Sequence, residues 1–163
     1  MSLLRLWTAI AGTALVLGGV AWLLKLWVIV ATDGRVVATG AAGALFDLGF
    51  YLLLAGSTGL GLRLMMNHEP AMRGVAAVAS PVAFILSFNV FLGIGYPTLA
   101  IAGAIVGEAL PSYLLDEGGI LLSALVWSLV GIWLLIDATL RGVTWGKRGY
   151  SGNREDQPQP RVR

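Results

Sequence analysis

The chain has no cysteine and a single histidine, His68, among its 163 residues. Without cysteine there is no disulfide, no thiolate metal site, no iron–sulfur cluster and no cysteine nucleophile. One histidine is too few for a bis-histidine haem or a multi-histidine metal site within one chain. Hydrolase motifs such as Gly-x-Ser-x-Gly and His-Glu-x-x-His are also missing. We therefore expect no cofactor, no metal site and no enzymatic activity.

Charged residues are scarce as well, at 12% of the chain, whereas 57% of the residues are hydrophobic. The mean hydropathy is +0.81. A soluble domain of this length cannot bury so much apolar surface, because its outer layer must face water. The formal charge of +2 does not indicate a nucleic-acid partner, since the basic residues do not cluster on a polar folded surface. The composition predicts that the main partner is the lipid bilayer.

Four apolar segments account for this hydropathy, and each is long enough to cross a bilayer as a helix. A signal peptide is the alternative for the first segment, since Arg5 precedes it and Ala31 offers a cleavage position. Its apolar stretch of about 24 residues is longer than a signal-peptide core, so we interpret it as a retained helix. The sequence thus predicts an all-α membrane protein with four transmembrane helices, at about 7–31, 41–66, 74–95 and 119–140.

A shorter apolar piece, about 98–110, lies between Pro97 and Pro111. A piece of that length is too short to cross the bilayer and is typical of a re-entrant or interfacial helix. The alternative is that it continues the third helix beyond a kink at Pro97. We favour a short helix near one face of the membrane. These segments form one transmembrane domain over residues 1–145, and the polar residues 146–163 are expected to form a disordered cytoplasmic tail.

The distribution of Lys and Arg predicts the orientation. Nine of the eleven basic residues lie on the side of the N-terminus, the loop after the second span and the tail. The other side has Arg35, together with Glu108, Asp116 and Glu117 in its long loop. Because basic flanks stay in the cytoplasm, we expect a multi-pass plasma-membrane protein with both termini cytoplasmic.

Ionisable residues inside the spans are the candidate functional groups, because each costs roughly 2.5–3.5 kcal/mol to insert. At ~1.5 Å per residue, Lys25 lies about 9 Å and Asp47 about 10 Å outward of the middle of their spans. These spans are joined by a short loop, so we predict that Lys25 and Asp47 pair. Asn89, on the third span, falls at a similar level and completes a candidate intramembrane polar cluster.

A second candidate pair lies at the inner edge of the membrane. Arg63 and Asp137 are both about 11–14 Å from the middle of their spans, so an ion pair between the second and fourth spans is expected. Snorkelling of Arg63 into the headgroups is the alternative.

Small residues at four-residue spacing offer close packing between helices. Thr8 and Gly12, Ser57 and Gly61, and Gly103 and Gly107 are examples. They suit packing within the chain or a homo-oligomer seam.

Two functions from different classes fit these patterns. The first is a small membrane protein without catalytic activity, acting as a structural or accessory component, with Lys25 and Asp47 fixing helix register. The second is a homo-oligomeric transporter or channel subunit in which Lys25, Asp47 and Asn89 line the path. Four helices alone rarely enclose a pathway, so the second function needs a homo-oligomer, whereas the first implies a membrane-protein partner.

Overall fold

The computed structural model describes residues 3–152, and its side-chain environments cover residues 3–140. The described residues are mainly helical, and four segments are long and apolar enough to span a membrane, which confirms the predicted all-α membrane fold. In chain order the elements are α1 (Leu3–Ala31), α2 (Gly40–Met66), the 3-10 turn η1 (Pro70–Met72), α3 (Arg73–Val106), α4 (Ser112–Leu115) and α5 (Gly118–Gly152).

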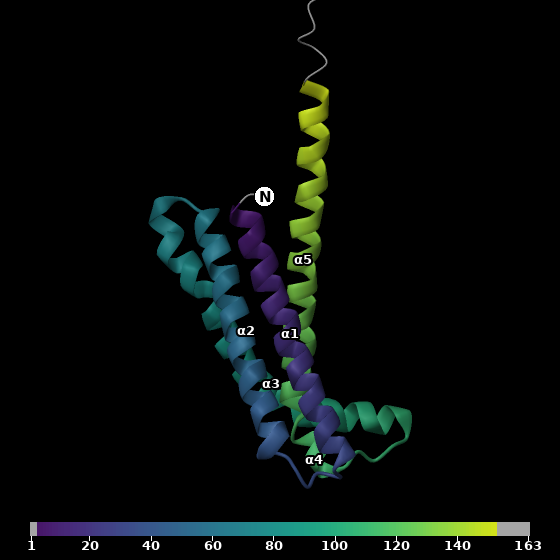
Figure 1. Cartoon of the computed structure of the whole chain (residues 1–163). Coiled ribbons are helices and arrows are strands. Elements are labelled where there is room, and N and C mark those ends of the chain that lie inside the picture. The colour runs from purple at the N-terminus through teal and green to yellow at the C-terminus, as the bar shows by residue number, and fades with distance from the viewer. Residues whose placement is uncertain (1–2, 153–163) are drawn as a thin grey trace, which may run out of the picture.

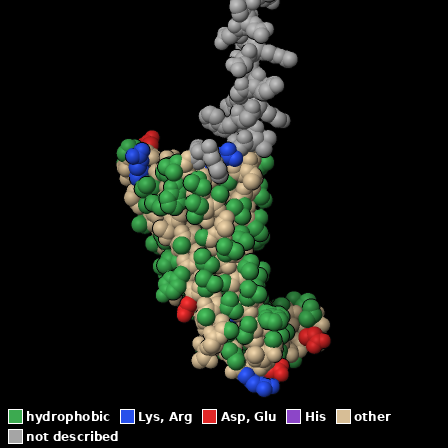
Figure 2. Space-filling view, in the orientation of Figure 1, with side chains coloured by type: hydrophobic (Ala, Val, Ile, Leu, Met, Phe, Trp, Pro, Cys, Tyr) green, Lys and Arg blue, Asp and Glu red, His purple; other side chains and the backbone are tan. Residues whose placement is uncertain are grey.

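The four long helices form a bundle in which α1 packs against α2 and α5, and α3 packs against the same two helices. Figure 1 shows that η1 and the N-terminus lie at one end of this bundle, whereas the α1–α2 connection and α4 lie at the other. Hydrophobic side chains cover the middle of the visible face, and most charged side chains gather toward the two ends (Figure 2). This distribution suits a bilayer with water at both ends of the bundle.

Aromatic side chains fill the core. Trp22 is fully buried, and its ring stacks on Phe46 at a centroid distance of 5.8 Å and lies 5.3 Å from Phe88. Its indole Nε1–H donates a 2.9 Å hydrogen bond to the carbonyl oxygen of Phe46. On the other side of the core, Trp127 Nε1–H donates to Ser87 Oγ at 3.1 Å. Each buried indole thus has the partner that it needs away from water.

Glycines set the close approach of the helices. An added methyl group at Gly12 would lie 2.8 Å from the carbonyl oxygen of Gly131, and the reverse substitution would meet the carbonyl of Gly12 at the same distance. At the other end of the bundle, Gly95 of α3 leaves no room for a side chain against Gly118 and Gly119 of α5. Small residues let these backbones meet, as expected where lipid supplies no hydrophobic drive for association.

The piece after Pro97 is part of α3, which continues without a break to Val106. The separate short helix predicted from about 98 to 110 is therefore not confirmed, and the piece instead continues α3, as in the alternative of an extension beyond Pro97. Pro97 lacks an N–H and crowds the preceding turn, so the helix bends rather than stops. Thr98 Oγ1–H donates 2.8 Å to the carbonyl oxygen of Ile94 across this turn. Figure 1 shows the last part of α3 turning sideways, away from the bundle.

Gly107 ends this extension. Its φ of 77° is left-handed, and the N–H groups of Gly107 and Glu108 bond to the carbonyl oxygens of Ala104 and Gly103 in a Schellman motif. Gly107 therefore serves as the helix cap, so its four-residue spacing from Gly103 does not form a packing stripe.

The helix that contains the fourth span continues beyond the predicted end of that span, whereas the apolar part itself ends at Leu140, as predicted. Helix α5 extends past residue 140 to Gly152 and so takes in the first residues of the predicted tail, which began at residue 146. The remainder of that predicted tail, 153–163, lies outside the described residues.

Candidate functional site

The ammonium of Lys25 on α1 forms an ion pair with the carboxylate of Glu117, the residue before α5. The two side chains are only 5% and 9% exposed. Lys25 lies one turn after Trp22, on the buried face of α1, which directs its ammonium into the bundle. Glu117 accepts the backbone N–H of Leu121 through its own carbonyl and lies at the positive end of the α5 dipole. Helix geometry thus stabilises the carboxylate that neutralises Lys25.

The predicted pairing of Lys25 with Asp47 was wrong, because Lys25 pairs with Glu117 instead. Asp47 is exposed and makes no ion pair within the described side chains. Its neighbour Phe46 faces α1 instead, with its ring centroid 5.5 Å from Lys25 Nζ. Successive residues on a helix point about 100° apart, so the orientation of Phe46 turns Asp47 away from Lys25. The two charges share a height but not a face.

Asn89 also stays apart from Lys25. It is exposed, and its Nδ2–H donates 2.8 Å to the carbonyl oxygen of Ile85, one turn earlier on the same helix. Its neighbour Phe88 contacts Trp22 and so occupies the inward direction at this height. The predicted cluster of Lys25, Asp47 and Asn89 is therefore not assembled as such.

A cavity opens at the end of the bundle that is predicted to face outward, where the α1–α2 connection meets the start of α2. Its volume is about 260 Å³. We call it the outer cavity, and it is lined by Lys25, Val37, Ala38, Gly43, Phe46, Asp47 and Glu117. It combines three charged side chains with an aromatic and aliphatic wall. Asp47 thus reaches the surroundings of the Lys25–Glu117 pair without joining it.

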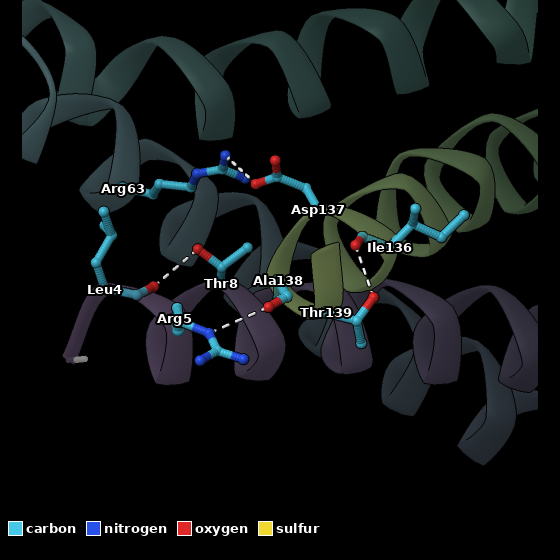
Figure 3. A network of polar contacts seen from close by, with 8 residues as sticks. All are labelled: Leu4, Arg5, Thr8, Arg63, Ile136, Asp137, Ala138 and Thr139. Atoms are coloured by element: carbon cyan, nitrogen blue, oxygen red, sulfur yellow. Dashed lines mark hydrogen bonds and ion pairs between the residues drawn. The ribbon is translucent and has the colours of Figure 1, made fainter. Parts of the chain in front are cut away.

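Arg63 and Asp137 meet at the opposite end of the bundle, as predicted for these two residues. Arg63 Nη2–H donates 2.6 Å to Asp137 Oδ2, and Arg63 is only 6% exposed (Figure 3). The guanidinium lies 5.6 Å from the ring centroid of Trp133, within the range of a cation–π contact. Snorkelling away from the bundle, the alternative for Arg63, is not what the structure shows.

Arg5 adds a third helix to the contacts around Arg63 and Asp137. Its Nε–H donates 3.2 Å to the carbonyl oxygen of Ala138, the residue after Asp137 (Figure 3). Helices α1, α2 and α5 are therefore joined by polar contacts within two consecutive residues of α5.

The acidic residue directly before α5 and the one near the far end of its apolar part are spaced by the thickness of a bilayer. Glu117 and Asp137 lie 20 positions apart, which is about 30 Å along a helix. The hydrocarbon core of a bilayer is also about 30 Å thick. This spacing would let each ion pair lie near one boundary of a bilayer, where burial of a charge costs less than at the centre.

Glu117 is the residue that the sequence analysis missed. The charge distribution alone placed it with Glu108 and Asp116 in an outer loop. The available signal was its position directly before the fourth apolar segment, one bilayer thickness from Asp137.

His68 does not form a metal site with its neighbours. Its Nδ1 lies 2.7 Å from the carbonyl oxygen of Leu64 in the last turn of α2. Over the part of the chain that the structure describes, no group of three or more metal-binding His, Cys, Asp or Glu side chains occurs.

Comparisons with known proteins give no assignment: no family model matches the chain, and neither a curated protein nor a solved structure matches it significantly.

Proposed function

We propose that the protein is a structural or accessory membrane component without catalytic activity of its own, with both termini in the cytoplasm of a plasma membrane. One observation carries this proposal. The charged pairs Lys25–Glu117 and Arg63–Asp137 each join two different helices, and three of these four side chains are more than nine-tenths buried. Buried charges that are paired between helices stabilise one arrangement of the bundle. They fit a rigid unit that other membrane proteins assemble around.

Position strengthens this argument. The Lys25–Glu117 pair connects α1 to the start of α5 at the proposed outer end of the bundle. The Arg63–Asp137 pair connects α2 to α5 at the proposed inner end. A helix fixed at both boundaries of the bilayer is poorly suited to the rocking motions of transport. The same arrangement suits a component whose role is to present a fixed surface.

The test is the mass of the gently solubilised protein from its native membrane, with every co-purifying protein identified. A defined heteromeric complex supports the accessory function. The Lys25→Met variant, which disrupts the outer ion pair, should lose that complex, whereas the exposed control Asp116→Asn should keep it. A homo-oligomer that carries no partner and conducts a solute would overturn the proposal.

A transporter or channel subunit is the second candidate, and the outer cavity is the observation that favours it. The cavity brings the exposed Asp47, the group that a solute would meet first, near the buried Lys25 and Glu117. Asn89 does not extend this polar surface inward, since it is exposed and bonds to its own helix. Solute flux into vesicles containing the purified protein, abolished by Asp47→Asn without loss of folding, supports this candidate.

A further inference from the structure

We propose that the outer cavity binds a small organic cation, a protonated amine with an apolar body. This inference goes beyond the accessory function and holds whether or not the site transports its ligand. A rigid scaffold does not require a cavity of about 260 Å³ beside a buried ion pair. The shape, charge and wall of the cavity each point to the same class of ligand.

The charge of the cavity lining favours a cation. Lys25 and Glu117 neutralise each other in their ion pair. Asp47 is left as a carboxylate for which the described side chains provide no ion-pair partner. The lining therefore carries one uncompensated negative charge, which attracts a positively charged ligand and repels an anion.

Accessibility identifies Asp47 as the contact. Glu117 is only 7% exposed, is bound to Lys25 and lies at the positive end of α5. Asp47 is exposed at the edge of the cavity, on the side of the α1–α2 connection that contributes Val37 and Ala38. A ligand that enters from that side meets the Asp47 carboxylate, and an ammonium group can donate a charge-assisted hydrogen bond to it.

The wall of the cavity selects an apolar body. Val37, Ala38 and Phe46 supply aliphatic and aromatic surface. The Phe46 ring already has the Lys25 ammonium 5.5 Å from its centroid, so it offers a ligand apolar surface, while the ligand's positive charge is left to Asp47. A divalent metal fits less well, because the described residues contain no group of three or more metal-binding side chains. The combination of carboxylate, ring and aliphatic wall matches an alkyl or arylalkyl amine.

The test is calorimetric titration of benzylammonium into the full-length protein in nanodiscs, with protein-free nanodiscs as the blank. Benzyl alcohol, which has the same ring without the charge, is the ligand control. We expect saturable binding of benzylammonium and no saturable binding of benzyl alcohol. Asp47→Asn should weaken binding about tenfold or more, as expected for loss of a hydrogen bond to a charged group. Asp116→Asn is the matched control, since it removes an exposed outer carboxylate that does not line the cavity.

A second pair of variants keeps the proposal testable if Asp47→Asn fails to fold. Ala38→Trp fills the mouth of the cavity without changing charge, and Thr39→Trp places the same bulk on an exposed neighbour outside the lining. We expect Ala38→Trp to abolish binding and Thr39→Trp to retain it. Three results would overturn the proposal. The protein could bind benzyl alcohol as tightly as benzylammonium, or show no saturable binding above the blank. The control variants Asp116→Asn or Thr39→Trp could also lose as much affinity as the variants that they control.

Discussion

Lys25 and Glu117 are 92 positions apart in the chain, yet their side chains form a buried ion pair that joins α1 to the start of α5. The pair lies beside the outer cavity and directly above the aromatic core, since Lys25 also faces the ring of Phe46. Loss of either charge leaves the other uncompensated in a largely apolar environment. The stability of the bundle should therefore depend on having both residues or neither.

The first prediction is a double-mutant cycle on this pair. Lys25→Met alone leaves the buried Glu117 carboxylate unpaired and should lower the free energy of unfolding by about 3–5 kcal/mol. The double variant Lys25→Met, Glu117→Leu should recover most of that loss, because no isolated charge remains. Unfolding of the purified protein in bicelles, followed by steric trapping, measures both values.

The control for this cycle replaces Asp47 instead of Glu117. Asp47 is exposed and makes no ion pair with Lys25. Lys25→Met, Asp47→Leu should therefore be as unstable as Lys25→Met alone. Recovery by Asp47→Leu rather than by Glu117→Leu would show that the pairing in solution is the one favoured by chain proximity.

The second prediction concerns Arg63. Arg63→Met removes both the hydrogen bond to Asp137 and the contact with Trp133, and should destabilise the protein by roughly 2 kcal/mol. The cost is smaller than at Lys25 because the Asp137 side chain, at 21% exposed, is less buried than that of Glu117. Arg63→Lys retains the charge and should recover part of the loss, measured in the same unfolding assay. Equal instability of both variants would mean that the charge itself contributes little.

The third prediction uses two glycines with opposite surroundings. Gly12→Ala places a methyl group 2.8 Å from the backbone oxygen of Gly131, so α1 and α5 must move apart. We expect a loss of about 1–3 kcal/mol from this overpacking. Gly93→Ala is the control, because a methyl group there meets no atom within 4 Å. Its effect should be neutral or slightly stabilising, since alanine is the better helix former.

The helices were predictable from the sequence, whereas the partners of the charged residues were only partly so. Hydropathy and length identify a span without any knowledge of its neighbours, and the four segments all became helices. Arg63 and Asp137 were matched by depth alone, and the structure brings them together. Depth failed for Lys25 because two carboxylates lie at a suitable height, and only the rotation of each helix decides between them.

Helix rotation is a property of packing rather than of hydropathy. The apolar residues of α1 and α2 surround each helix, so periodicity does not show which face meets the bundle. Trp22 and Phe46 set that rotation through their stacking and the indole hydrogen bond, and Asp47 follows by turning outward. The continuation of α3 beyond Pro97 was open for a similar reason, since proline marks a bend or an end equally well.

The last prediction tests the orientation in the membrane. Because the chain has no cysteine, single cysteines at Thr39, Asn67 and Ser151 report position without background. Thr39 and Asn67 are exposed at opposite ends of the bundle, in the α1–α2 connection and directly after α2. In intact cells, an impermeant maleimide should label Thr39→Cys, whereas Asn67→Cys and Ser151→Cys should react only after permeabilisation. The excess of Lys and Arg on the side of Asn67 is the physical reason, since basic flanks stay in the cytoplasm. The reverse pattern would place the outer cavity in the cytoplasm, where any amine that it binds would have to be an intracellular one.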